Sequence, residues 1–291
     1  MLGCGWRTLV VENPADLSLS ESGICINQDE RPSIPVDQLK NLIITSSKGS
    51  LSIALLNTLS RNNIGVIICN EKKLPACEVI NSGEHSMYSG NLMKQISWDS
   101  ERKAQLWKSI VEHKISNQMK LLSLLNIVVP SSLREYYGAV EPDDRTNREA
   151  MAAKVYFSAL FGHKFRRHAP DNTNSALNYG YTIVRSSIDR IIAAHGYNTA
   201  LGINHCSVTN RFNLSCDIME PFRPFIDRVV YENGGRELDW DYKKLLIELT
   251  QITCIYGGME MSLETAMEQY FLYTVKYLAD KDCSPGEIDF G

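Results

Sequence analysis

The sequence predicts an α+β fold, in which a small β-rich N-terminal domain is followed by a larger all-α domain. The first eighty residues hold short apolar or alternating runs between Gly, Pro and Asn turn signals, a pattern typical of strands. The chain around residues 81–90 is rich in Ser, Gly and Asn, and helical periodicity dominates after about residue 97. We therefore place the domains at residues 1–82 and 98–291, with a linker at residues 83–97.

The N-terminal domain is expected to contain mainly strands, together with one helix near residues 51–60. Turn signals such as Asn13-Pro14 and Ser22-Gly23 separate the first strand-like runs, because Gly and Pro interrupt regular structure. These runs occupy residues 8–11, 17–20, 24–26, 42–45, 64–69 and 74–80.

In the second domain, apolar residues recur every three or four positions, which predicts helices. The longest pattern begins near residue 97 or 100 and ends near residue 125. Further helices are expected at residues 145–160, 174–194, 217–231, 242–253 and 263–278. The tail from Ser284 onward contains Pro and Gly, and we expect it to be frayed.

The composition excludes several classes of protein. With 44% hydrophobic and 22% charged residues, the chain can bury a core and is not wholly disordered. No apolar stretch approaches the roughly 18 residues of a membrane helix, and the start lacks the basic and apolar segments of a signal peptide. The eight cysteines form no C-x-x-C pair, which argues against a zinc ribbon. We expect a reduced, cytoplasmic protein that does not enter the membrane.

The net charge of −4 hides an uneven distribution. Residues 145–168 carry six basic residues and one acidic residue, a net charge of +5. Residues 232–291 carry five basic and twelve acidic residues, a net charge of −7. A charge run usually marks a solvated face, but beside a candidate metal site a basic run favours phosphate binding.

Glu149 lies on an apolar line of its expected helix. Ala153, Tyr156 and Leu160 follow it at helical spacing. Burying a lone carboxylate is costly, so Glu149 must be paired, hydrated in a cavity or bound to a metal. The alternative to a metal is an ion pair with Arg145, four residues earlier.

Two further candidate ligands lie in a loop and at the start of an expected helix. His205 lies in a polar loop between helices, where it is either a structural residue or a ligand. Asp217 and Glu220 have the D-x-x-E spacing of a capping box, with Asp217 as N-cap. Pro221 and Pro224 restrict the helix start, which indicates a stiff local geometry. Glu220 therefore either caps the helix or binds a cation, and spacing does not decide.

Two carboxylates and one imidazole make a mixed oxygen and nitrogen ligand set. Such a set suits Mg²⁺ or Mn²⁺ and leaves open positions for phosphate oxygens and water. A cation held in this way can polarise a phosphodiester and stabilise the leaving oxygen. Whether the three side chains meet in space is not shown by their spacing.

Four segments occur in a fixed order along the chain: NREAMAAKVYF at residues 147–157, NYGY at 178–181, GINH at 202–205 and DIMEPFRP at 217–224. Together they closely resemble the CRISPR-associated integrase of spacer acquisition, most closely its type II branch. The resemblance covers essentially the whole chain. It implies a DNA endonuclease and integrase in which Glu149, His205 and Glu220 bind Mg²⁺ or Mn²⁺ and carry catalysis. Asp217 lies close enough to support the site or to cap the helix.

The resemblance also implies partners and a reaction. The first domain is expected to form a homodimer, and two such dimers are expected to flank a dimer of a small second adaptation protein. The substrates are duplex DNA, a protospacer and a CRISPR repeat, and a 3′-hydroxyl attacks a phosphodiester of the repeat. From charge and position, the expected phosphate contacts are Arg148, Lys164, Arg166, Arg167 and Arg223.

Two alternatives use the same residues differently. A structure-specific metal-dependent nuclease would replace the 3′-hydroxyl by water and would hydrolyse DNA without joining it. A non-catalytic DNA-binding scaffold subunit would need no metal and would bind DNA equally well in the presence of EDTA.

Overall fold

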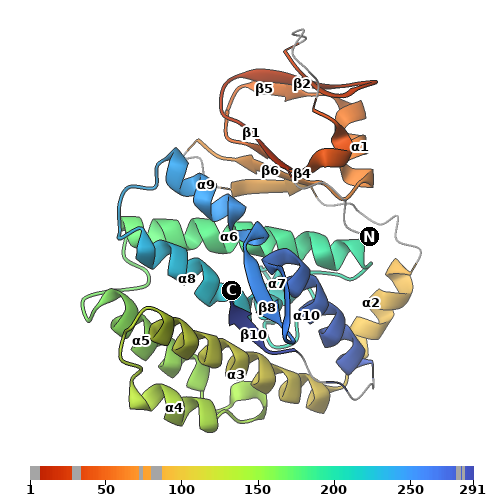
Figure 1. Cartoon of the computed structure of the whole chain (residues 1–291). Coiled ribbons are helices and arrows are strands. Elements are labelled where there is room, and N and C mark those ends of the chain that lie inside the picture. The colour runs from red at the N-terminus through yellow and green to blue at the C-terminus, as the bar shows by residue number, and fades with distance from the viewer. Residues whose placement is uncertain (1–6, 28–33, 72–74, 80–86, 280–282, 284–285) are drawn as a thin grey trace. The chain divides into compact units, whose positions relative to one another are not determined.

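The computed structural model of the chain describes residues 7–27, 34–71, 75–79, 87–279, 283 and 286–291. These residues form two compact units (Figure 1). The first comprises Met1–Ser89 together with Asp189–Tyr197, and the second comprises Gly90–Ile188 together with Asn198–Gly291. The fold class predicted from the sequence is confirmed, because strands and sheets at the N-terminus precede a mainly helical region.

The first unit contains two small sheets and helix α1 (Ile53–Arg61). In the four-stranded sheet, β1, β4 and β6 run parallel and β7 is antiparallel to β6. Apolar side chains of both sheets and of α1, among them the fully buried Leu42 and Leu55, form one core. The strands are β1 (Arg7–Val11), β4 (Leu39–Ile44), β6 (Gly65–Cys69) and β7 (Pro75–Val79) in one sheet and β3 (Gly23–Ile26), β2 (Ala15–Ser20) and β5 (Gly49–Leu51) in the other.

The strand patterns and the helix of the N-terminal region are thus confirmed, and β5 is an addition. The sequence pattern does not predict the three-residue strand β5, because Gly-Ser-Leu is too short to show an alternating run. Strand β5 is held in place by its parallel pairing with β2. The next residue, Ser52, caps α1 by accepting a hydrogen bond from the Leu55 amide.

Helices dominate the second unit, and the predicted patterns agree with α3, α5, α6 and α10 within a few residues. Asp99 caps the longest of them, α3, by accepting a hydrogen bond from the Arg102 amide. The last turns of α6 belong to the first unit. The helices are α2 (Tyr88–Ile96), α3 (Ser100–Leu124), α4 (Ser131–Gly138), α5 (Arg148–Phe161), α6 (Asn172–Ala194), α7 (Asn213–Met219), α8 (Arg223–Glu232), α9 (Trp240–Glu248) and α10 (Leu263–Leu278).

The expected linker at residues 83–97 contains helix α2, and its residues 83–86 lie outside the described part. The single helix expected at residues 217–231 is wrong. Helix α7 ends at Met219, the 3₁₀ turn η3 (Glu220–Phe222) follows, and α8 begins at Arg223. Pro221 and Pro224 lack the amide hydrogens that a continuous helix would use, which explains the break.

The second unit is not purely helical. A three-stranded antiparallel sheet, in the order β10 (Ile288–Phe290), β8 (Thr253–Tyr256), β9 (Met259–Ser262), lies within it (Figure 1). The helix expected at residues 242–253 is therefore too long, since α9 and the turn η4 (Leu249–Gln251) end before β8. The frayed tail is wrong for residues 288–290, because β10 pairs with β8 through contacts that a local pattern does not reveal.

The described helices include none that combines the length and the apolar character needed to span a lipid bilayer.

Candidate active site

Helix α3 forms one wall of the candidate site. Its buried face carries Trp107 and, seven residues later, Lys114. Two turns of helix separate these residues, so they project from the same face. The edge of the Trp107 ring contacts the His205 ring at a centroid distance of 5.7 Å. Lys114 contacts both candidate carboxylates, so one helix face touches all three residues of the expected ligand set.

Glu149 lies in the first turn of α5, and Asp144 fixes that turn. The two oxygens of Asp144 accept hydrogen bonds from the amides of Arg148 at 2.8 Å and Glu149 at 2.9 Å. Asn147, the N-cap position, has a φ of 54°, a left-handed conformation that Asn tolerates well. Asp144 therefore does the capping that the Asn147 side chain does not, and it anchors the backbone of Glu149.

The partner of Glu149 is Lys114, whose Nζ donates a hydrogen bond to Oε1. The ion pair with Arg145 that the sequence offered as an alternative is wrong as the pairing of Glu149. Arg145 instead lines a different cavity, together with Asp143. Arg145 precedes α5, which begins at Arg148, so the four-residue spacing within one helix does not apply to Arg145 and Glu149. The side chain of Glu149 is 29% accessible, so a ligand can reach it.

Glu220 begins the 3₁₀ turn η3 and is almost fully buried. Its Oε2 lies 2.5 Å from Lys114 Nζ and 2.9 Å from Arg223 Nε. Burial alone would raise the pKa of Glu220, but the charges of Arg223 and Lys114 outweigh it and hold the pKa at about 2. The same turn is tied to α3 by Asn117, whose side-chain amide donates to the Pro221 carbonyl at 2.8 Å.

Asp217 holds the loop that carries His205. Its Oδ2 accepts from the amides of Ile203 at 2.6 Å and Asn204 at 3.2 Å. Its Oδ1 lies 3.1 Å from the His205 amide and 2.6 Å from His205 Nδ1. Asp217 has no accessible surface and lies inside α7, so the expectation that it caps the helix is wrong.

The contact between His205 and Asp217 fixes the orientation of the imidazole. A carboxylate accepts, so Nδ1 carries the proton and Nε2 is the nitrogen that can coordinate a cation. The hydrogen bond to Asp217 raises the pKa of His205 despite its partial burial. Gly202 lets the loop pass close to this carboxylate, since a Cβ there would lie 2.8 Å from Asp217 Oδ2.

A second set of buried polar groups lies beneath Arg223 and was missed by sequence reasoning. The Arg223 guanidinium stands 4.6 Å from the centre of the Tyr181 ring. The Tyr181 hydroxyl donates to Asp227 Oδ1, and the Tyr156 hydroxyl donates to Oδ2 at 2.9 Å. Burial raises the pKa of Asp227 to about 6, although both tyrosine hydrogen bonds act in the opposite direction. Tyr156 and Tyr181 lie in the quoted motifs, but nothing local pointed to Asp227.

A cavity of about 650 Å³ extends from Glu149 along the basic run. Arg166 and Arg167, two of the five expected phosphate contacts, line it with Lys154 and two histidines. Phe157 and Phe165 give the same cavity aromatic walls. The full lining is Glu149, Ala150, Ala153, Lys154, Phe157, Ser158, His163, Phe165, Arg166, Arg167 and His168.

The other expected phosphate contacts differ in environment. Lys164 is exposed. The Arg148 guanidinium stands 5.7 Å from the centre of the Tyr136 ring. Arg223 is engaged by Glu220 and Tyr181, so in this arrangement it serves the carboxylate first.

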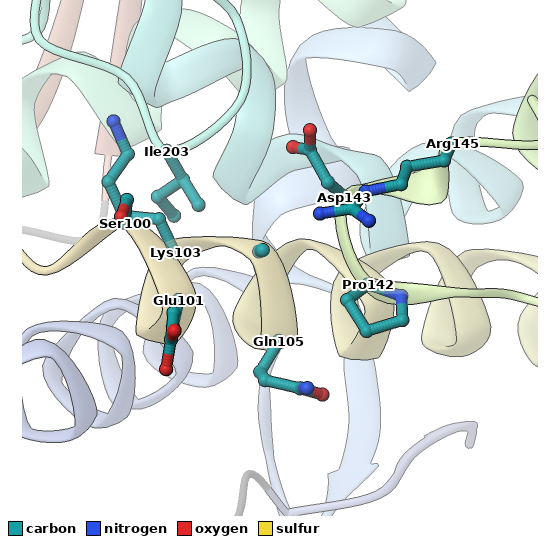
Figure 2. A pocket seen from close by; sticks show the side chains of 9 residues that line it. Ser100, Glu101, Lys103, Gln105, Pro142, Asp143, Arg145 and Ile203 are labelled. Carbon is teal, nitrogen blue, oxygen red and sulfur yellow. The ribbon is translucent and has the colours of Figure 1, made fainter.

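A separate cavity of about 540 Å³ lies where the start of α3 meets the turn η2 (Pro142–Asp144) and the loop of His205 (Figure 2). Figure 2 shows Lys103 and Glu101 on α3, and Asp143 and Arg145 on the segment of η2 that lies next to this helix. The charges of these four side chains are balanced, so this cavity offers no net attraction for a polyanion.

The residues present suit a divalent cation in their chemistry. Glu149 and Glu220 already share one positively charged group, and His205 offers Nε2 on the same face of α3. In the part of the chain described, however, no three His, Cys, Asp or Glu side chains form a ready metal-binding group. A cation bound by both carboxylates would therefore take the place of the Lys114 ammonium.

Comparison with known proteins identifies the family. The sequence profile described as CRISPR associated protein Cas1 matches residues 8–237. The chain is 34% identical over 234 residues to a CRISPR-associated endonuclease Cas1 from Neisseria meningitidis serogroup C (strain 8013), covering 79% of this chain and 77% of that protein. It is 26% identical over 283 residues to a CRISPR-associated endonuclease Cas1 from Francisella tularensis subsp. novicida (strain U112), covering 86% and 88%.

Solved structures show the same fold. A casposase bound to integration product gives a TM-score of 0.78 at 16% identity, covering 96% of this chain and 92% of that one. A Cas1 protein from Thermotoga maritima gives 0.76 at 18% identity, covering 95% and 98%. A Cas6-RT-Cas1–Cas2 complex gives 0.70 at 17% identity, covering 97% of this chain and 36% of that one. By its sequence match and by its fold, the chain belongs to the Cas1 family of CRISPR-associated proteins.

Proposed function

We propose that this Cas1-family protein is a divalent-metal-dependent DNA endonuclease and integrase that inserts short duplex DNA into a CRISPR array by 3′-hydroxyl transesterification. The observation that carries the proposal is the convergence of Glu149 and Glu220, from α5 and η3, on one cationic group. Two acidic side chains that already hold a positive charge form a natural site for Mg²⁺ or Mn²⁺. His205 adds a nitrogen ligand, as the sequence motifs imply.

The protein groups have separate roles in this site. Glu149, Glu220 and His205 would hold the cation, and Asp217 keeps the imidazole in the orientation that presents Nε2. Arg223 keeps Glu220 ionised, because the guanidinium lies against the same oxygen. When bound, the cation would activate the attacking oxygen and stabilise the charge on the leaving oxygen.

The cavity that extends from Glu149 supplies a path for DNA. Lys154, Arg166 and Arg167 can neutralise phosphates along it, and Phe157 and Phe165 offer rings for stacking. The proposal that DNA is the substrate gains support from the casposase bound to integration product, whose fold this chain shares. The double-stranded substrates would be a protospacer and a CRISPR repeat.

The proposed assembly is a homodimer formed through residues 1–82, together with a small second adaptation protein. The Cas6-RT-Cas1–Cas2 complex, which contains a region of the same fold, supports a partner of this kind. Assignment to the type II branch and location in the cytoplasm stay predictions from the sequence.

Strand transfer into a repeat-bearing plasmid, with Mn²⁺ or Mg²⁺ and the partner protein, tests the proposal. E149A, H205A and E220A are expected to lose joined product while remaining folded by circular dichroism. E232A is the matched control, because Glu232 is an exposed glutamate on α8 that pairs only with Arg228 among the described contacts. Full joining by all three site variants would refute the site assignment.

The same assay separates the alternatives. Duplexes that end in a 3′-deoxynucleotide are expected to give no joined product, since the attacking hydroxyl is missing. Cleavage that ignores this change, with no joining by either duplex, would favour a hydrolytic nuclease. DNA binding that survives both EDTA and E220A, with no turnover in Mn²⁺, would favour a non-catalytic scaffold.

A further inference from the structure

Lys114 occupies an unusual position on α3. Its neighbours on the buried face of the helix are Ile110 and Val111 on one side and Leu121 on the other, all without accessible surface. The helical spacing that places these residues inside also places Lys114 inside, and only 7% of its side chain is accessible. A buried ammonium without partners would be very costly, so its partners decide whether it can be there.

Those partners are the two candidate metal ligands. Nζ donates to Oε1 of Glu149 and to Oε2 of Glu220, the latter at 2.5 Å. Arg223 also contacts Glu220 Oε2. Two carboxylates thus face two cations, and the cluster of Lys114, Glu149, Glu220 and Arg223 has no net charge. The two ion pairs offset the cost of burying the ammonium.

We propose that Lys114 is a positioning residue that acts as a resident counter-ion: it holds Glu149 and Glu220 together before metal binds and leaves their oxygens when a divalent cation arrives. This inference rests on the proposed function, because it concerns the metal site assigned there. The geometry supports it because the ammonium lies between one oxygen of each carboxylate, where a cation shared by both would lie.

Electrostatics makes Lys114 and a divalent cation compete for Glu149 and Glu220. A divalent cation and an ammonium repel each other strongly at contact distance in a buried site, and a cation that bridges Glu149 Oε1 and Glu220 Oε2 needs the two oxygens that Lys114 contacts. Each binding event must therefore displace Lys114 from its ion pairs. The wild-type protein then binds metal more weakly than its ligands alone would allow. In the metal-free protein, Lys114 keeps the two carboxylates together. Lys114 also has a flexible four-carbon stem, which lets the ammonium move without moving α3.

The test measures binding of Mn²⁺ to the full-length protein without DNA, by titration calorimetry and by the electron paramagnetic resonance signal of free Mn²⁺. K114Q and K114M are expected to bind Mn²⁺ at least tenfold more tightly than the wild type, because the competing charge is gone. K114R keeps the charge and is expected to bind no more tightly than the wild type. K108Q is the control, since Lys108 lies on the same helix, is 35% exposed and pairs with Glu112.

Thermal unfolding provides a second readout. Without metal, K114Q and K114M are expected to unfold at a lower temperature than the wild type, because the buried Glu220 and the partly accessible Glu149 then lose the cation that they share. Saturating Mn²⁺ is expected to raise their unfolding temperature by more than it raises that of the wild type. If both variants fail to fold, K114R, which preserves the charge, decides: tighter Mn²⁺ binding by K114R would overturn the inference.

Failure of this inference is distinguishable from failure of the proposed function. Wild-type Mn²⁺ binding that E220Q and H205A weaken at least tenfold would support the metal site, and unchanged or weaker binding by folded K114Q would then overturn the role of Lys114 alone. If neither the wild type nor folded K114Q binds Mn²⁺ at this site, both are overturned.

Discussion

His205 Nδ1 lies 2.6 Å from Asp217 Oδ1, and the same carboxylate accepts the backbone amides of residues 203, 204 and 205. One buried side chain thus fixes both the loop and the ring that it carries. The loop has little other regular structure, so the position of the imidazole depends on Asp217. In this way Asp217 gives the His205 imidazole a defined orientation.

Replacing Asp217 by Asn is expected to disturb this loop. The Asn amide nitrogen would face hydrogen-bond donors, leaving one or two of them without an acceptor at about 1–3 kcal/mol each. Strand transfer is expected to fall roughly 10- to 100-fold, with a lower unfolding temperature. D241N is the control, since Asp241 is an exposed aspartate on α9. Wild-type transfer by D217N would contradict the role of Asp217.

Replacing Asp144 by Ala is expected to loosen the first turn of α5. The change removes the acceptors of the Arg148 and Glu149 amides, which should cost about 1–2 kcal/mol of the free energy of unfolding. Strand transfer should also fall, because the backbone of Glu149 loses its anchor. D99A removes the equivalent cap of α3, where Asp99 accepts from the Arg102 amide at 2.9 Å. D99A is expected to lose similar stability and to keep transfer; equal transfer by both variants would argue against positioning by Asp144.

The free energy of unfolding is expected to depend on the ionisation of Asp227. Its pKa in the folded protein, about 6, exceeds the ordinary value of roughly 3.9. The folded state therefore binds this proton more tightly, and the stability gained is full below about pH 4 and is lost as the pH rises through 6. Asn does not titrate, so the stability of the wild type relative to D227N should decrease by up to about 3 kcal/mol between pH 4 and pH 7. Urea unfolding at several pH values measures this difference; a difference that stays constant or grows with pH would contradict it.

Binding of duplex DNA is expected to depend on the basic run and on salt. Lys164 is exposed at the end of this run, so K164A should weaken binding and reduce the slope of log K against log salt by about 1. K244A is the control, since Lys244 is exposed in the acidic C-terminal region and pairs with Glu248. Fluorescence anisotropy over a range of salt concentrations measures both slopes. Equal slopes for K164A and the wild type would remove Lys164 from the DNA contacts.

Much of the fold was predictable because its signals are local. The α10 pattern gave its bounds correctly, since Ser262 caps the start of the helix and the apolar period continues to Leu278. The hairpin of β8 and β9 was hidden for the opposite reason. Its strands are short, and β8 also pairs with β10, whose residues lie about thirty positions away in the sequence.

The candidate site divides along the same line. The chain by itself determined which residue types stand in the motifs, and these indicated the family and the choice of Glu149, His205 and Glu220 as candidate ligands. Only the tertiary structure decided that Glu149 pairs with Lys114 rather than with Arg145, and that Asp217 holds His205. The physical reason is that a buried charge is stabilised by whatever charges the fold brings beside it, and those partners are distant in the sequence. Helical spacing placed Lys114 on an apolar face, but only packing showed what neutralises it.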